Sequence, residues 1–205
     1  MIHLIGAGGH CSVVLDALLE CGVDLGGIRV RDGNVRMAGL QLLGVSVETP
    51  DISPALAGHS FHIAIGSAAI RRRLYAEGEA VGGRALSVLH PRACISRFSS
   101  VGAGSLVAAM AIVGPGARLG HGVIVNHGAV VDHDCEVDDF THLAPNCSLG
   151  GGVRIGARTL IGAGAAILPG VSVGDDVTVG AGAVVTRDIG SNQTWTGIPA
   201  VPKAT

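Results

Sequence analysis

The chain has 205 residues, of which 48% are hydrophobic and only 15% are charged, so we do not expect it to be disordered. Its formal net charge of −2, with no basic run longer than Arg71-Arg72-Arg73, argues against a nucleic-acid or an anionic-membrane partner. Its apolar stretches reach about eight residues, whereas a membrane-spanning helix needs roughly 20. Five cysteines without a C-x-x-C pair, and an N-terminus without a signal-peptide pattern, predict a cytoplasmic protein with reduced thiols.

Residues 1–90 are predicted to form one α/β domain with a small parallel sheet. Strands are expected at 2–5, 27–31, 61–65 and 84–89, with one helix after the first strand and a second helix at 68–79. The first helix is expected to stop at Gly22 and to have an apolar face made of Val13, Val14, Ala17, Leu18 and Cys21. Because about 90 residues make half of a dinucleotide-binding fold, a half-Rossmann-like domain that binds a nucleotide diphosphate is favoured over one that binds NAD.

A glycine-rich loop, GAGGH, connects the first strand to the first helix. It lacks the third glycine of the dinucleotide fingerprint, so a tight turn is the alternative to phosphate binding. In the functional interpretation, the loop N–H groups at Gly8 and Gly9 bind a phosphate or pyrophosphate at the start of the helix. Asp32, after the second strand, would accept a hydrogen bond from a ribose hydroxyl, and Gly66, after the third, belongs to the same substrate-binding set.

The main feature of residues 91–205, the second predicted domain, is a hexapeptide repeat. From Ile95 to Val185 every sixth residue is aliphatic, and the residue four positions later is small or β-branched. Neither a helix, with a period of about 3.6, nor an ordinary strand, with a period of about 2, produces this spacing. The repeat predicts a parallel β-helix in which three hexapeptides form one triangular coil. Residues eighteen apart then stack on one face, and residues six apart lie on different faces.

Five segments resemble one bacterial family: GAGGH, AIGSAAIRRRL, HPRACIS, NHGAVVDHDCEVDDFTHLAP and TGIPAVP. They are similar to segments of the hexapeptide-repeat sugar acetyltransferases of the sialic acid O-acetyltransferase (NeuD) and nucleotide-aminosugar N-acetyltransferase (PglD) type, over nearly the whole chain. The resemblance implies a left-handed β-helix, an exception to the right-handed crossover rule. It also implies a homotrimer, a nucleotide-linked sugar bound by the N-terminal half, and acetyl-CoA bound as cosubstrate between neighbouring subunits.

Three histidines, His121, His127 and His133, are spaced six apart, which raises the alternative of a metal site. The coil places them on three different faces, so one chain does not bring them together, although neighbouring subunits could. We therefore expect no metal, and we interpret His121 as a solvated turn residue.

The resemblance assigns the catalytic base to His133, which lies between Asp132 and Asp134. An amine that attacks a thioester must lose a proton, and an imidazole that titrates near neutrality is suited to accept it. Asp134 matches the acidic partner of the family, often Glu and one methylene longer, and would fix the tautomer of the imidazole. An exposed histidine in an acidic turn is the alternative.

Three further residues carry over from the resemblance. Asn126 matches an asparagine near the substrate, His142 matches a histidine that contacts the thioester region of acetyl-CoA, and His10 matches a histidine near the nucleotide-sugar site. The alternatives are a turn role for Asn126 and a packing or trimer contact for His142. Cys135 and Cys147, at the small-residue position of the repeat, are expected to be buried.

Three glycines are assigned to acetyl-CoA binding. Gly162 and Gly180 would allow a pantetheine arm to approach closely, although turn geometry explains them equally well. Gly151 lies eighteen residues after His133, so its N–H is expected beside the base, where it would donate to the oxyanion of the tetrahedral intermediate. A loose turn in Gly150-Gly151-Gly152 is the alternative.

We therefore expect an acetyl-CoA-dependent N-acetyltransferase that acts on a nucleotide-linked amino sugar, a 4-amino-4,6-dideoxyhexose, for surface glycan biosynthesis. O-acetylation of a sialic acid is the second candidate in this class. A metal-dependent lyase or hydrolase and a non-catalytic scaffold are the alternatives from other classes. Metal analysis tests the first of these, and release of the CoA thiol on adding candidate sugars tests the second.

Overall fold

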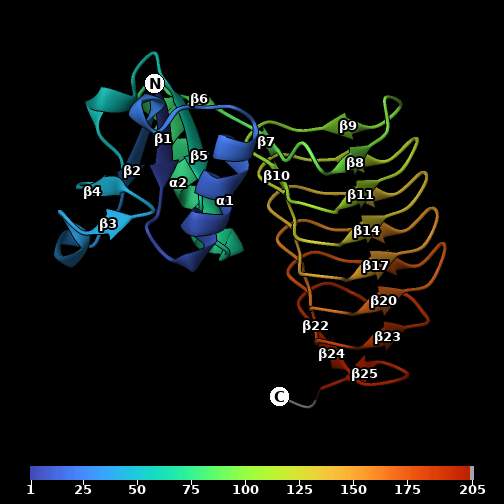
Figure 1. The fold of residues 1–205 in the computed structure, drawn as a ribbon. Coiled ribbons are helices and arrows are strands. Elements are labelled where there is room, and N and C mark those ends of the chain that lie inside the picture. Colours follow the sequence, from blue (N-terminus) through green and yellow to red (C-terminus); the bar gives the residue numbers. More distant parts are fainter. Residues whose placement is uncertain (204–205) are drawn as a thin grey trace.

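In the computed structural model, which describes residues 1–203, an α/β body stands beside a stack of strand coils (Figure 1). The α/β body contains a six-stranded sheet with the order β3-β4-β2-β1-β5-β6, parallel except for the β3–β4 pair. Its elements are β1 (Ile2–Ile5), α1 (Gly9–Glu20), β2 (Ile28–Arg31), β3 (Gln41–Leu42), β4 (Val45–Glu48), β5 (Ser60–Ile63), α2 (Ala68–Ala80) and β6 (Arg84–Ala85), with 3-10 turns at Leu25–Gly27, Val35–Met37 and Pro54–Leu56.

The parallel sheet and its two helices confirm the predicted α/β domain. The predicted apolar face of α1 is correct for Val14, Ala17 and Leu18, which are buried. It is wrong for Cys21, which caps the end of the helix and is exposed. Gly22 ends the helix as expected, because its φ of +82° turns the chain so that the Val23 N–H donates back to Leu18 O at 3.1 Å.

The β3–β4 hairpin is missing from the predicted elements. Its two-residue turn, Leu43-Gly44, has positive φ at both positions (45° and 86°), as tight hairpins require. A leucine is rare in that conformation, so the sequence carries no recognisable turn signal. β4 extends the parallel sheet beyond β2, and the sheet is therefore larger than expected.

From Val88 onward the chain forms three sheets, parallel except for the β24–β25 pair, that are the three faces of a prism (Figure 1). The docking face contains β7 (Val88–Leu89), β10 (Leu106–Val107), β13 (Ile124–Val125), β16 (His142–Leu143), β19 (Leu160–Ile161) and β22 (Thr178–Val179), followed by β24 (Thr194–Thr196) and β25 (Val201–Pro202). The small-residue face contains β8 (Cys94–Ile95), β11 (Ile112–Val113), β14 (Val130–Val131), β17 (Ser148–Leu149), β20 (Ala166–Ile167) and β23 (Val184–Val185). The charged face contains β9 (Ser100–Val101), β12 (Arg118–Leu119), β15 (Glu136–Val137), β18 (Arg154–Ile155) and β21 (Ser172–Val173).

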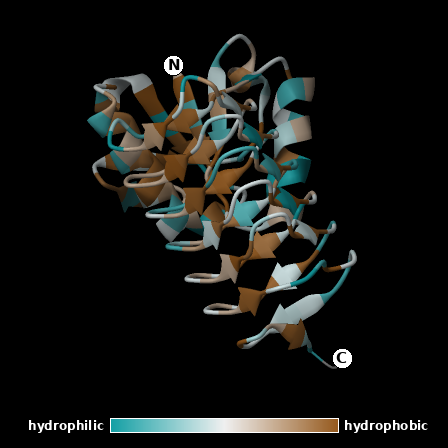
Figure 2. Ribbon diagram, turned by 90° about the vertical axis from the view of Figure 1, so that its right-hand side faces the viewer, coloured by the Kyte–Doolittle hydropathy of each residue, from teal (hydrophilic) through white to brown (hydrophobic). Residues whose placement is uncertain are grey.

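The register confirms the eighteen-residue coil, since Ile124 pairs with His142 and His142 with Leu160. The repeat aliphatics from Val107 to Val185 point inward and are at most 4% exposed. Cys135 and Cys147 fill corner positions at 0% exposure, as expected. The domain is a left-handed parallel β-helix. Figure 2 shows its stacked strands as mostly hydrophobic and many of its turns as paler or hydrophilic.

The three edges of the prism are called the Asn126, His133 and Phe140 edges, each after one residue in its turns. The Asn126 edge joins the docking face to the small-residue face. The His133 edge joins the small-residue face to the charged face, and the Phe140 edge joins the charged face back to the docking face. His121, His127 and His133 therefore lie on three different edges, as the coil predicts.

The α/β body packs against the docking face, where Leu106 and Ile124 share one buried cluster with Leu4 and Val14. The chain changes sheets between Ala85 and Val88, so the expectation that 84–89 joins the first sheet is wrong for Val88–Leu89, which pairs with β10. The domain division at residue 90 stays a prediction. No helix within residues 1–203 combines the length and the apolarity that crossing a membrane requires.

Candidate active site

The glycine-rich loop exposes backbone N–H groups at the start of α1. Gly6 is buried with a φ of +102°, and a Cβ there would lie 2.5 Å from Ile65, so only glycine fits. Gly8 and Gly9 are exposed with open space around them. Within residues 1–203, their N–H groups and that of His10 have no hydrogen-bond acceptor. The loop can therefore offer several donors to an anion.

Asp32 shapes this loop from the end of β2. Its Oδ2 accepts from the Ala7 N–H at 2.8 Å and its Oδ1 accepts from the Asn34 N–H at 2.8 Å. The carboxylate thus has a structural role that the sequence did not indicate. Each oxygen keeps a second lone pair, so the predicted ribose contact stays a prediction.

His10, Asn126 and His142 come together where the α/β body meets the prism. The rings of His10 and His142 are 6.3 Å apart between centroids, and Asn126 Nδ2 lies 3.3 Å from His142 Nε2. The amide is a donor at this contact, so His142 Nε2 accepts and its proton is on Nδ1. Asn126 Oδ1 also accepts from the His127 N–H at 2.9 Å, so Asn126 has the turn role as well.

Burial lowers the pKa of both His10 and His142 to about 4, with the Arg71 charge as a further cause. Both imidazoles are therefore neutral at physiological pH, each with one donor and one acceptor nitrogen. The Nε2 atom of His10 is buried without a partner within residues 1–203. This pair suits hydrogen bonding to hydroxyl and amide groups rather than charge neutralisation.

A cavity of about 410 Å³ opens between the start of α2 and the docking face. His142 and Gly66 line it, and a Cβ on Gly66 would lie 3.8 Å from His142 Cε1. The other lining residues are Ser67, Ala68, Arg158, Thr159 and Leu160. Of the six residues predicted to bind substrate, His10, Gly66 and Asn126 thus lie beside this cavity or its histidine.

His133 projects from the His133 edge with its side chain 58% exposed. Its Nδ1 donates to Asp134 Oδ2 at 2.9 Å, which leaves Nε2 as a free acceptor. Asp134 has a φ of +57°, and the shorter carboxylate reaches the ring from this left-handed conformation. The hydrogen bond to Asp134, followed by the Asp132 charge, raises the pKa of His133 above its ordinary 6.5.

Gly151 lies against the His133 ring, as the coil predicts. A Cβ on Gly151 would be 2.4 Å from His133 Nε2, so a side chain there would displace the ring. Its φ is outside the left-handed region, and its N–H has no acceptor within residues 1–203. Glycine is therefore needed at position 151 because a side chain would collide with the His133 ring, and not because the turn has a positive φ.

Gly162 and Gly180 stack in line with Asn126 along the Asn126 edge, because their distances from it in the sequence are multiples of eighteen residues. A Cβ on Gly162 would lie 2.5 Å from Ala181 N, and one on Gly180 would lie 2.7 Å from Thr196 Cγ2. Coil packing alone therefore explains both glycines, and their acetyl-CoA contacts stay predictions.

One chain does not bring the two halves of the candidate site together. His10, Asn126 and His142 lie at the docking face or its Asn126 edge, whereas His133, Asp134 and Gly151 lie on the His133 edge. In a triangular prism that edge is opposite the docking face, and Figure 1 shows the α/β body on the other side of the coils from it.

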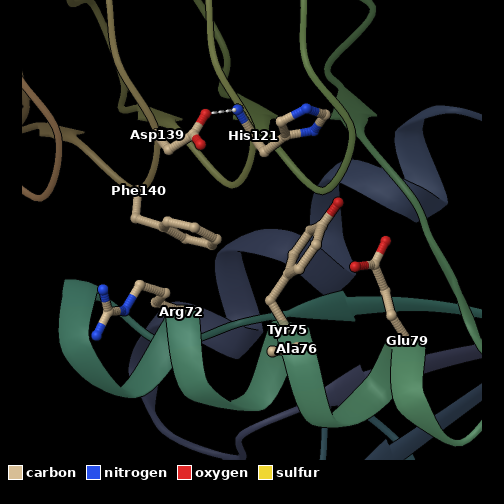
Figure 3. A pocket seen from close by; sticks show the side chains of 7 residues that line it. All are labelled: Arg72, Tyr75, Ala76, Glu79, His121, Asp139 and Phe140. Carbon is tan, nitrogen blue, oxygen red and sulfur yellow. Dashed lines mark hydrogen bonds between the residues drawn. The ribbon is translucent and has the colours of Figure 1, made fainter.

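A second cavity, of about 330 Å³, lies between α2 and the Phe140 edge (Figure 3). Tyr75 and Glu79 point toward it from the helix, which also contributes Arg72 to the lining, and the His121 N–H donates to Asp139 Oδ1 at 2.7 Å on the opposite wall. None of the predicted site residues lines it. No group of three metal-ligating side chains occurs within residues 1–203.

Arg71 is the residue of this region that the sequence analysis missed. It is 1% exposed and joins the Gly66 loop to the prism through backbone carbonyls. A signal was present, because Arg71 shares the spacing of Leu74, Tyr75 and Gly78 on the buried face of α2. A charged residue at an apolar position of a helix indicates a buried polar contact.

Comparison with known proteins covers both halves of the chain. Residues 1–77 match the PglD N-terminal domain family, and residues 152–187 match the hexapeptide repeat of succinyl-transferase. A perosamine N-acetyltransferase from Caulobacter crescentus, solved with CoA and GDP-perosamine, is 34% identical, with a TM-score of 0.94 over 100% of this chain and 97% of that one. The chain belongs to the PglD-type sugar acetyltransferases.

Two further solved members of the family align over almost their full length. The acetyltransferase domain of PglB from Neisseria gonorrhoeae, solved with acetyl coenzyme A, is 37% identical, with a TM-score of 0.91 over 98% of each chain. WeeI from Acinetobacter baumannii is 25% identical, with a TM-score of 0.88 over 99% of each chain. A search of curated proteins gave no match. The family resemblance inferred from the sequence is confirmed, and this PglD-type protein is an acetyltransferase.

Proposed function

We propose that this enzyme transfers the acetyl group of acetyl-CoA to the amino group of a nucleotide-linked amino sugar, a 4-amino-4,6-dideoxyhexose. The observation that carries the proposal is the His133 imidazole, which Asp134 holds with Nε2 free beside the open Gly151 N–H. The chain is also 34% identical, over its full length, to an enzyme solved with CoA and GDP-perosamine.

The reaction is a direct transfer. The sugar amine attacks the thioester carbon, and His133 Nε2 takes the proton that the amine must lose. The carbonyl oxygen becomes an oxyanion, to which the Gly151 N–H donates. When the carbon–sulfur bond breaks, the His133 imidazolium returns the proton to the CoA thiolate, so the products are an amide and CoA thiol.

The substrate would span the α/β body and the Asn126 edge. The free N–H groups of Gly8 and Gly9 suit the diphosphate, and Asp32 suits the ribose. The neutral rings of His10 and His142 are placed for the sugar hydroxyls. The free donors of the loop favour this nucleotide-linked substrate over a free sialic acid, whose O-acetylation is the second candidate.

We propose a homotrimer in which the small-residue face turns toward the threefold axis. Its outward residues are uncharged and mostly apolar: Cys94, Ile112, Val130, Ser148, Ala166 and Val184. On the charged face, by contrast, Arg118 and Arg154 both pair with Glu136. Charged residues are depleted at the core of interfaces, so the small-residue face fits an interface and the charged face fits solvent.

This arrangement completes the active site. The small-residue face lies between the Asn126 edge and the His133 edge, so a cyclic assembly brings the Asn126 edge of one subunit to the His133 edge of the next. The groove between them would hold acetyl-CoA, with Gly162 and Gly180 on one side and Gly151 on the other. Five unpaired cysteines fit the reducing cytoplasm, where acetyl-CoA and nucleotide sugars are made.

The test is an assay of acetyl-CoA with UDP-, GDP- and dTDP-linked 4-amino sugars, read as CoA thiol release. One of them should be turned over, and His133→Ala should lower kcat by about 10²–10⁴-fold, the effect of losing a general base. The affinity of the variant for the nucleotide sugar should stay unchanged, because the diphosphate is bound elsewhere. A variant with near-wild-type turnover at neutral pH would remove His133 from the mechanism, and turnover of free sialic acid alone would favour the second candidate.

A further inference from the structure

Arg71, in the first turn of α2, is a buried cation without a carboxylate partner. It is 1% exposed, and within residues 1–203 it forms no ion pair. Its neighbours Arg72 and Arg73 are exposed instead, and Arg73 pairs with Glu77 at 2.8 Å. A buried charge is costly unless hydrogen bonds compensate it, so its retention needs a reason.

The guanidinium donates to five backbone carbonyls from two parts of the molecule. Nη1 donates to Ile65 O at 3.0 Å and to Gly66 O at 2.8 Å. Nε donates to Gly122 O at 2.7 Å, and Nη2 donates to the carbonyls of Phe140 and Thr141. Arg71 therefore fixes the loop after β5 against the Phe140 edge of the prism.

These contacts orient the amides at the cavity. The carbonyl and the N–H of a trans peptide point in opposite directions. Fixing the Ile65 and Gly66 carbonyls on Arg71 therefore directs the N–H groups of Gly66 and Ser67 away from it. Neither N–H has an acceptor within residues 1–203, and both residues line the 410 Å³ cavity together with His142.

The carbonyls satisfy the N–H groups of Arg71, but within residues 1–203 no carboxylate neutralises its charge. Burial lowers its pKa to about 10, so it is still charged at neutral pH. The titratable groups whose pKa values it affects are His10, His62 and His142, all neutral. Arg158, which lines the cavity, is already paired with Asp176 at 2.6 Å. The cavity therefore has one unmatched positive charge behind a row of free N–H donors.

We propose that Arg71 is a positioning residue that makes the substrate site selective for a nucleoside diphosphate over the uncharged nucleoside. It does so by directing the Gly66 and Ser67 N–H groups into the cavity and by placing its own charge behind them. The proposal rests on the proposed function, since it assigns the diphosphate of that substrate to this side of the site.

The experiment compares binding of UDP, GDP and dTDP with binding of uridine, guanosine and thymidine by calorimetry, using the full-length protein. With the pair that wild type binds, Arg71→Met should weaken the diphosphate by about 10–100-fold, the range for a lost charged hydrogen bond, and change the nucleoside by less than about twofold. Arg73→Met is the matched control from the same helix and should change neither. A merely structural role would weaken both ligands equally, which would overturn the proposal.

If Arg71→Met does not fold, Arg71→Lys tests the same selectivity for the diphosphate over the nucleoside. Lysine keeps the charge but cannot hold five carbonyls, so the diphosphate should weaken by about threefold to tenfold with the nucleoside unchanged. Equal loss of both ligands overturns the role of Arg71 alone. If wild type binds none of the three diphosphates, the proposed function fails, and the inference fails with it.

Discussion

In the proposed catalytic pair His133–Asp134, an aspartate stands where the family resemblance often has glutamate. Aspartate is one methylene shorter than glutamate, yet its Oδ2 lies 2.9 Å from His133 Nδ1. The left-handed φ of Asp134 belongs to its turn position, because Gly116 and Gly152, eighteen residues before and after it, also have positive φ; aspartate tolerates this conformation better than most residues. The same carboxylate fixes the tautomer and raises the pKa of the ring.

The pH dependence follows from the direction of that shift. The base acts in its neutral form, so activity is lost as pH falls through the raised pKa of His133. Asp134→Asn removes the largest cause of the raised pKa, so the acidic limb of the kcat–pH profile should move to lower pH. The plateau should fall by about tenfold, because the imidazolium loses its hydrogen-bonded carboxylate.

Asp132→Asn is the matched control for this profile. Asp132 also raises the pKa of His133, but through its charge alone, since its Oδ1 accepts from the backbone N–H and not from the ring. Its replacement should move the acidic limb less than Asp134→Asn does. An acidic limb that stays in place in Asp134→Asn would show that another group controls the profile.

The sequence predicted the site residues whose position a motif or repeat determines. It did not indicate the roles of residues whose contacts lie far away along the chain. The family resemblance assigned His133, and the position of Gly151 beside it follows from the eighteen-residue coil, because the stacking is a property of the repeat. Arg71 does not, since its carbonyl partners at Gly122 and Phe140 lie 51 and 69 residues away. The structural role of Asp32 was missed for a similar reason, because Ala7 is 25 residues away.

At the scale of the elements, the stacked turns of the prism determine which residues the base can touch. Gly151 occupies the turn position next to His133, and a Cβ there would lie 2.4 Å from Nε2. The equivalent turn position of the same coil on the Phe140 edge is Ala157, which carries a side chain. The difference is local to the candidate site, so the fold does not demand glycine at this turn position.

Valine keeps the backbone N–H of residue 151, but its side chain should block the thioester from reaching that N–H. Gly151→Val should therefore lower kcat by about 10²–10³-fold, as the loss of an oxyanion donor does, with the trimer and nucleotide-sugar affinity intact. Because the side chain also displaces the His133 ring, the variant is combined with His133→Ala in a double-mutant cycle. A further loss of residual activity in the double variant identifies the oxyanion contact. Ala157→Val is the matched control, and full activity of Gly151→Val with an unchanged KM for acetyl-CoA would place the oxyanion elsewhere.

Element prediction was reliable where periodicity is long and poor where elements are short. The β-helix repeats one hexapeptide pattern over many coils, so every coil indicates the same strand register. β3 has only two residues, and its turn at Leu43-Gly44 places a leucine at positive φ. Val88–Leu89 reads as a continuation of the first sheet because a two-residue strand carries no information about its partner.

At the scale of the whole molecule, the prism separates the two halves of the site. The residues proposed to face the substrate lie on the docking side and the proposed catalytic residues lie on the opposite edge, so a single subunit should be inactive. The family resemblance predicted the trimer, but the repeat alone could not specify which face forms the interface. That choice depends on the outward residues of each face, among which Ile112 is 42% exposed in the single chain.

Subunit mixing tests this division of the site. One variant carries His10→Ala and His142→Ala, and the other carries His133→Ala, so each has a lesion in a different half. In a cyclic assembly each site draws one half from each of two neighbours, so equal co-expression should restore about a quarter of the wild-type sites. Light scattering of the mixture should give three times the chain mass of 20.5 kDa.

The control mixes His133→Ala with Gly151→Val, whose lesions lie on the same edge of one subunit. Every site in that mixture has a damaged catalytic half, so no activity should return. A site contained within one chain makes a different prediction for the first mixture, because each chain then carries its own lesion and no combination repairs it. Absence of recovery in a stable trimer, or a monomer at micromolar concentration, would therefore contradict the shared site. Recovery near one quarter would require that the sugar held by one subunit is acetylated by the base of the next.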